Sequence, residues 1–168
     1  MKPGKDFEDR IRKRLERAGC HVVKLPDASA PFIRDEDGKT AKGGARFTSK
    51  NPYDLLVLRP ARDAPQSLSA PYAMECKTTA GKTFTVATVK PHQLAGLLAF
   101  PWCAGVVVEL RGLSRCFFVR AEVVAQWAEI AGKKSMNLDD LNGNATQLPV
   151  NTTGRESRTY YDVAGIFA

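Results

Sequence analysis

The sequence lacks a hydrophobic run long enough to cross a membrane. Its longest apolar stretch, from Leu94 to Val108, is interrupted by Pro101 and ends at Glu109. That is short of the roughly 20 apolar residues that a membrane-spanning helix needs. The first six residues contain charged side chains and no apolar core of a signal peptide. These absences predict a cytoplasmic protein that is not attached to a membrane.

Cysteines are few and widely spaced, and none forms a CxxC pair; they stand at Cys20, Cys76, Cys103 and Cys116. This spacing excludes the common zinc-binding patterns. Four cysteines in a chain of 168 residues also argue against a disulfide scaffold. We therefore expect reduced, mostly buried thiols, as in a cytosolic protein.

The chain has the size of one domain and carries an excess of positive charge. Its 168 residues (18.4 kDa) predict a single domain over residues 1–168, with a core over about residues 5–131. The formal charge is +7 and the pI is about 9.4. Residues 1–50 hold 13 Lys and Arg against 8 Asp and Glu, so +5 of the +7 lies in the first third. Such a charge favours an anionic partner, although many basic proteins bind none.

An amphipathic helix is predicted over residues 6–18, with Asp6 as its N-cap and Gly19 just past its end. Its apolar stripe comprises Phe7, Ile11, Leu15 and Ala18. Glu8 lies at the border of this stripe, whereas the basic side chains of the helix face away, by default into solvent; they are Arg10, Lys13, Arg14 and Arg17.

Residues 26–50 predict a long, mobile loop. They are rich in Pro, Gly, Asp and Lys and show no periodicity, after a short strand over residues 21–25. Loops of this length are usually functional or disordered. We expect its basic side chains to contact a phosphate backbone, namely Lys39, Lys42, Arg46 and Lys50.

The remaining pattern predicts a three-layer α/β domain around a mixed sheet. Expected strands lie at residues 53–58, 71–77, 104–110 and 115–120, and expected helices begin at residues 91 and 121. Residues 59–70 contain Pro and Ser and predict a connection. Residues 132–158 are polar and turn-rich and predict an irregular segment within a C-terminal extension over residues 132–168. The apolar residues at its end can dock back onto the body; they are Tyr160, Tyr161, Ile166 and Phe167.

Charged residues interrupt two of these apolar strands. Glu75 and Lys77 share one face of their strand, and Asp54 begins a strand that can pair beside it. Uncompensated charges there would cost several kcal/mol each, roughly. A hard divalent cation such as Mg²⁺, which favours carboxylate, carbonyl and water oxygens, would remove that cost. It would polarise a phosphodiester, and Lys77 would stabilise the charge that develops on it.

Asp54 followed by Glu75-Cys76-Lys77 resembles the D…(D/E)xK signature of the PD-(D/E)xK nuclease superfamily. More specifically, the chain is similar to Holliday junction resolvases of the RecU and Hjc types. The similarity covers roughly residues 5–120 and includes Phe7-Glu8, Ser49 and His92-Gln93. Tyr53 separates Pro52 from Asp54, so the literal PD dipeptide is missing.

This resemblance implies a restriction-endonuclease-like fold with an αβββαβ core and a Mg²⁺-dependent DNA endonuclease, a crossover junction endodeoxyribonuclease, with Mn²⁺ as a substitute. Glu8, Asp54 and Glu75 would handle the metal, Lys77 the catalysis, and Gln93 and Ser49 the edge of the site toward DNA. The family acts as homodimers that place symmetric nicks in a four-way junction. A prokaryotic cytoplasm, or the host cytoplasm for a phage protein, would be the place of action.

Other interpretations compete with this one. Glu75 and Lys77 would form an ion pair on a solvated sheet face if no site were present, and Glu8 would then only stabilise a helix N-terminus. A different nuclease of the same superfamily, of repair or restriction type, is the second function. The third is a non-catalytic DNA-binding protein. Clustered carboxylates argue against the third, because they repel phosphate. Six apolar residues are candidates for either a dimer interface or core packing: Tyr160, Tyr161, Ile166, Phe167, Trp102 and Trp127.

Overall fold

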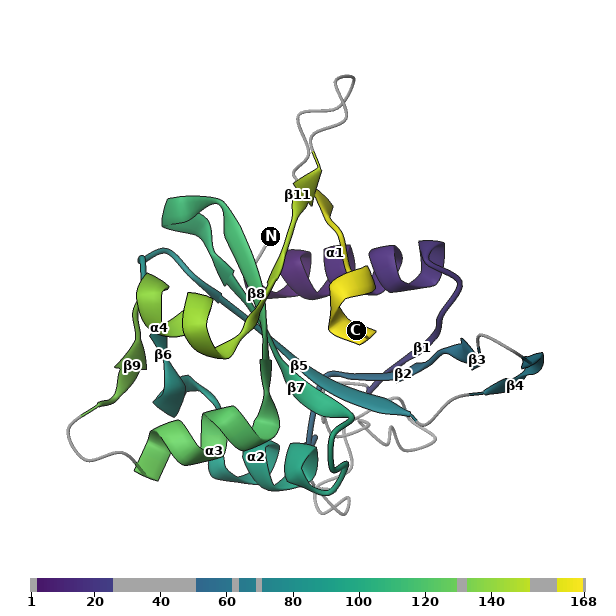
Figure 1. The fold of residues 1–168 in the computed structure, drawn as a ribbon, viewed down its shortest axis with the longest axis horizontal. Coiled ribbons are helices and arrows are strands. Elements are labelled where there is room, and N and C mark those ends of the chain that lie inside the picture. Colours follow the sequence, from purple (N-terminus) through teal and green to yellow (C-terminus); the bar gives the residue numbers. More distant parts are fainter. Residues whose placement is uncertain are drawn as a thin grey trace, which may run out of the picture.

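A six-stranded mixed sheet forms the centre of this computed structural model, which describes residues 3–25, 51–61, 64–68, 71–129, 133–151 and 160–167 (Figure 1). Strands β5 and β7 are parallel, and the other neighbouring pairs are antiparallel. In spatial order the strands are β1 (His21–Lys24), β2 (Leu55–Leu58), β5 (Tyr72–Thr79), β7 (Ala104–Leu110), β8 (Arg115–Arg120) and β10 (Thr146–Leu148).

Helices cover both faces of this sheet. Helix α1 (Pro3–Arg17) lies on one face, and helices α2 (Pro91–Leu98) and α3 (Ala121–Glu129) lie on the other (Figure 1). The order α1, β1, β2, β5, α2, β7 is the αβββαβ core expected from the sequence. The three-layer α/β class with a central mixed sheet is therefore confirmed.

Helix α1 packs through the predicted apolar stripe. Phe7, Ile11 and Leu15 are fully buried, since they recur at i+4 steps toward the sheet. The helix begins at Pro3, a favoured first-turn residue, so Asp6 lies in the first turn rather than at the N-cap. Ala18 lies past the helix end and is exposed. Gly19 follows with a φ of 85°, the left-handed conformation that commonly ends helices.

The expectation of an irregular extension after residue 132 is wrong. The segment contributes β9 (Ser135–Met136), α4 (Leu138–Asn144), the sheet strand β10, β11 (Val150–Asn151), β12 (Tyr160–Tyr161) and the 3₁₀ helix η3 (Ala164–Phe167). Its buried residues include Met136, Leu141, Leu148, Tyr161 and Ile166. Each element is too short to show a period in the sequence, and polar residues separate the buried ones. The core therefore extends well beyond residue 131.

Short elements complete the fold. The connection expected over residues 59–70 contains a two-stranded pair, β3 (Pro60–Ala61) with β4 (Ala64–Leu68). The stretch after β5 forms β6 (Phe84–Thr85), which pairs with β9, and the 3₁₀ helix η1 (Val86–Thr88); η2 (Arg111–Leu113) links β7 and β8. None of the described helices is long and apolar enough to span a membrane.

Candidate active site

The backbone on both sides of Asp54 fixes its carboxylate beside β5. The Leu25 amide donates to the Asp54 carbonyl (2.9 Å), and the Asp54 amide donates to the Met74 carbonyl (3.0 Å). The β2–β5 ladder ends at the Leu55–Met74 pair. Beyond it, the Cys76 amide donates to Asp54 Oδ2 at 2.8 Å. The Asp54 carboxylate thus accepts a backbone hydrogen bond that a neighbouring strand would otherwise accept. This bond holds the carboxylate next to Glu75.

Glu75 and Lys77 lie on the predicted common face of β5, toward α2. Met74 packs in the core beneath α1, whereas Ala73 packs in the core beneath α2, which confirms the alternation. Glu75 is 1% exposed. Lys77 Nζ lies 2.7 Å from Glu75 Oε1. The pair is therefore a buried acid with a neighbouring cation and not an ion pair on a solvated surface.

Gln93 joins this pair from the first turn of α2. Its side-chain amide donates to Glu75 Oε1 at 2.5 Å, and its carbonyl oxygen Oε1 accepts from Lys77 Nζ at 3.2 Å. The same oxygen accepts from the Lys90 amide at 3.0 Å, in the manner of a residue that caps a helix start. Pro91 at the beginning of the helix suits that position. The helix start therefore orients Gln93 toward Glu75, as the sequence predicts.

The second carboxylate oxygen of Glu75 has no partner among the described residues. Oε2 is buried and accepts no hydrogen bond there. Burial, followed by the nearby charge of Asp54, raises the pKa of Glu75 to about 7, although Lys77 and Gln93 act in the opposite direction. A buried acid whose pKa is raised beside a second carboxylate, with one oxygen unpartnered, forms a centre that attracts a cation.

These features fit a divalent metal ion. A hard cation takes carboxylate oxygens, and Glu75 Oε2 and the Asp54 carboxylate supply them. Across the part of the chain that the structure describes, no three His, Cys, Asp or Glu side chains converge as a metal-binding group. Asp54 and Glu75 are therefore the pair that would hold the ion, together with backbone or water oxygens.

Glu8 approaches this pair from the other face of the sheet. Burial raises its pKa, and the charge of Asp54 adds to that effect. Its carboxylate, however, lies 2.9 Å from Lys24 Nζ on β1. The sequence did not predict this ion pair. A metal-binding role for Glu8 stays a prediction, and it requires Lys24 to release the carboxylate.

Thirteen chains of solved structures are similar to this one. The structure of Hjc, a Holliday junction resolvase from the archaeal hyperthermophile Archaeoglobus fulgidus, is similar to this chain with a TM-score of 0.48 and 15% sequence identity. The similarity covers 86% of this chain and 95% of that chain. No family model and no curated protein sequence matches the chain.

Several predicted DNA-contacting residues lie outside the described part of the chain. They are Ser49, Lys39, Lys42, Arg46 and Lys50, all within residues 26–50. Their roles stay predictions.

The four cysteines are free thiols; Cys20 and Cys116 are buried, and Cys76 and Cys103 are partly buried.

A second buried acid escaped the sequence analysis. Glu109 on β7 is 4% exposed and accepts from Arg10 Nη2 (2.7 Å), the Thr78 hydroxyl (2.8 Å) and the Tyr161 hydroxyl (2.8 Å). The expectation that Arg10 faces solvent is therefore wrong. A carboxylate that is buried without partners destabilises the fold by roughly several kcal/mol. The three donors offset this cost. Glu109 stands two residues after Val107, so strand alternation places both side chains on the α1 face of β7. This alternation could have identified Glu109 as a buried acid.

We expect the stability of the metal-free protein to depend on pH through Glu75. The folded-state pKa of about 7 exceeds the ordinary value of 4.5, so the folded state binds the extra proton. The resulting stabilisation is complete below about pH 4.5 and disappears as the pH rises through about 7. Glu75→Gln removes this dependence. Urea unfolding of both proteins in EDTA between pH 5 and pH 8 measures the difference, up to roughly 3 kcal/mol.

Glu16→Gln, on the exposed surface of α1, is the matched control and should follow the wild-type curve. Parallel curves for wild type and Glu75→Gln would mean that Glu75 titrates normally and would remove the electrostatic argument for a cation.

Proposed function

We propose that the protein is a Mg²⁺-dependent DNA endonuclease that resolves four-way junctions as a homodimer. The observation that carries the proposal is the unpartnered, buried Glu75 oxygen beside Asp54, with the Lys77 ammonium 2.7 Å from the other Glu75 oxygen. In a protein that only bound DNA, these carboxylates would repel the DNA phosphates. Together with a cation and a lysine, the same acids suit phosphodiester hydrolysis.

Each side chain has a distinct task in this proposal. Asp54 and Glu75 would hold the cation, with Mn²⁺ as a substitute, and when bound it supplies positive charge at the scissile phosphate and lowers the pKa of water. Lys77 places a fixed ammonium at the same point, where negative charge develops on the phosphate. Gln93 holds Glu75 and Lys77 in register through one amide group. Ser49 and the basic residues of 26–50 would contact the DNA backbone.

The homodimer follows from the symmetry of the substrate. A four-way junction has near two-fold symmetry, and one active site per chain requires two chains to cut opposed strands. Among the interface candidates with described side chains, Trp127, Tyr161 and Ile166 are core residues, and Phe167 packs against the core. Trp102, in contrast, is 73% exposed. It is therefore our candidate for the dimer contact. The dimer would act in the cytoplasm of a prokaryote or of a phage host.

The decisive experiment compares a labelled four-way junction with a linear duplex of matched sequence, in Mg²⁺ and in EDTA. We expect cleavage only in Mg²⁺, faster on the junction, by a species near twice 18.4 kDa in sedimentation. Mixed dimers with one Glu75→Gln subunit should nick one strand only. Equal cleavage of both substrates by a monomer would favour the repair- or restriction-type nuclease. Absence of cleavage under all conditions would refute the endonuclease.

A further inference from the structure

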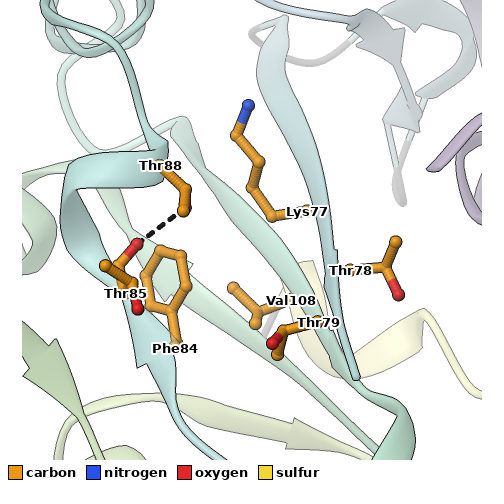
Figure 2. A pocket seen from close by; sticks show the side chains of 7 residues that line it. All are labelled: Lys77, Thr78, Thr79, Phe84, Thr85, Thr88 and Val108. Carbon is orange, nitrogen blue, oxygen red and sulfur yellow. Dashed lines mark hydrogen bonds between the residues drawn. The ribbon is translucent and has the colours of Figure 1, made fainter. Parts of the chain in front are cut away.

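A small slot opens beside Lys77, on the side away from Asp54. Its volume is about 70 Å³, and it lies between β5 and residues 84–88 (Figure 2). Lys77 and Thr79 line it from β5, and Thr85 and Thr88 line it from the opposite segment. Phe84 and Val108, both buried in the core, give it an apolar base. The slot is therefore mostly apolar, with threonine side chains in two of its walls.

The position of the slot relates it to the acids of the site. Glu75, Lys77 and Thr79 follow one another on the same face of β5, at steps of roughly 6–7 Å. The slot thus lies one such step beyond Lys77 along β5, whereas Asp54 and Glu75 lie on the opposite side of Lys77. A DNA strand advances about 3.4 Å per nucleotide, so this step corresponds to about two nucleotides.

The surrounding charge favours a nucleic-acid backbone. The sequence contains no Asp or Glu between Cys76 and Glu109, whereas Lys77, Lys82 and Lys90 lie in that stretch. Lys82 and Lys90 are exposed and stand near the two ends of the segment that forms the slot wall. A phosphodiester chain that enters here from the site therefore meets cations and no carboxylate of this segment.

The chemistry of the lining separates a sugar from a phosphate. A phosphate inside the slot would need several N–H donors or cations, and Lys77 is the one ionisable side chain in its lining. A furanose ring presents apolar C–H groups and a few oxygens, which match Phe84, Val108 and the threonine side chains. Thr79 Oγ1 accepts from the Gly81 amide at 3.2 Å, so its own hydroxyl proton can be donated to a ligand oxygen.

We propose that this slot binds the deoxyribose of a nucleotide within about two positions of the scissile phosphate, and that Lys82 and Lys90 contact the phosphates beyond it. The inference rests on the proposed function, because the scissile phosphate is placed at Lys77. It adds a binding subsite for the DNA strand, formed by the Thr-rich segment after β5.

Thr85 offers a clean test because its exposed backbone is extended (φ −82°, ψ 111°), a conformation that Leu and Val adopt readily. Thr85→Leu enlarges the side chain at the wall of the slot, whereas Thr85→Val keeps its shape and removes the hydroxyl. The probe is a trimer of tetrahydrofuran phosphate, a sugar-phosphate chain without bases, titrated in EDTA and followed by methyl NMR. We expect the Thr79 and Val108 methyl signals of the wild type to shift. Thr85→Leu should weaken trimer binding at least about tenfold, and Thr85→Val should bind more tightly than Thr85→Leu.

Other outcomes distinguish failure of this subsite from failure of the proposed endonuclease activity. The binding assay needs no cleavage, so a wild type that binds the trimer at Thr79 and Val108 but cuts no DNA would refute the endonuclease and retain the subsite. If the wild type cuts DNA but the trimer leaves both methyl signals unchanged, or Thr85→Leu binds it like wild type, the subsite is wrong. Inorganic phosphate that shifts the same signals as strongly as the trimer would also overturn the sugar assignment.

Discussion

Asp54→Asn and Glu75→Gln should each lower Mg²⁺-dependent DNA cleavage by a factor on the order of 1000 or more and leave DNA binding intact. Each change removes one negative charge of the pair that would hold the ion, and Glu75 Oε2 has no hydrogen-bond partner among the described residues. Removal of a carboxylate also reduces repulsion from phosphate, so the affinity for DNA should stay equal or rise slightly. Single-turnover cleavage of a labelled junction and binding in EDTA measure the two effects.

Glu16→Gln is the matched control, because it removes one negative charge from the exposed surface of α1. It should cleave like the wild type. Cleavage by Asp54→Asn or Glu75→Gln within a few fold of the wild-type rate would contradict the active-site assignment, provided that the circular dichroism spectrum shows the variant to be folded.

Lys77→Met should lower the cleavage rate by about 100- to 1000-fold, through loss of a cation where charge develops. Methionine retains an unbranched apolar side chain of similar length. The ammonium also holds the pKa of Glu75 down, so its loss raises that pKa further and weakens Mg²⁺ binding near neutral pH. At pH 9, above the wild-type Glu75 pKa of about 7, the raised pKa matters less, and calorimetry should give a Mg²⁺ affinity close to the wild-type value while cleavage stays slow.

Lys13→Met, on the exposed side of α1, provides the control for loss of one positive charge. Wild-type cleavage by Lys77→Met at pH 9 would show that the lysine acts only through the ionisation of Glu75. Loss of Mg²⁺ binding at that pH would instead assign Lys77 a structural role.

The centre of the site could be predicted because its residues stand where charge conflicts with pattern. Glu75 and Lys77 interrupt a strand of otherwise apolar character, and strand alternation places them on one face. Gln93 stands two residues after Pro91, a strong marker of a helix start, so its place in the first turn could be inferred as well. Local rules of strand and helix were sufficient for these three residues.

Pairings between distant segments could not be predicted in the same way. Lys24 pairs with Glu8 because β1 returns alongside α1, and Arg10 reaches Glu109 across 99 residues of chain. On a helical wheel Arg10 belongs to the basic side, and nothing local indicates that a buried acid lies within its reach. The elements after residue 132 were missed for a related reason. β10 has three residues and joins the sheet only because β8 provides an edge.

The contact between Phe7 and Tyr161 has a consequence for the biosynthesis of the protein. The two rings pack edge to face at 6.1 Å, and Tyr161 also donates to the Glu109 carboxylate beneath α1. Helix α1 is translated well before Tyr161, which helps to complete its burial. Since domains form their long-range contacts only when both segments are available, the nascent chain keeps part of the α1 stripe uncovered until the segment with Tyr161 has been made. Protection of that stripe by a chaperone on the translating ribosome would then determine the yield of folded protein.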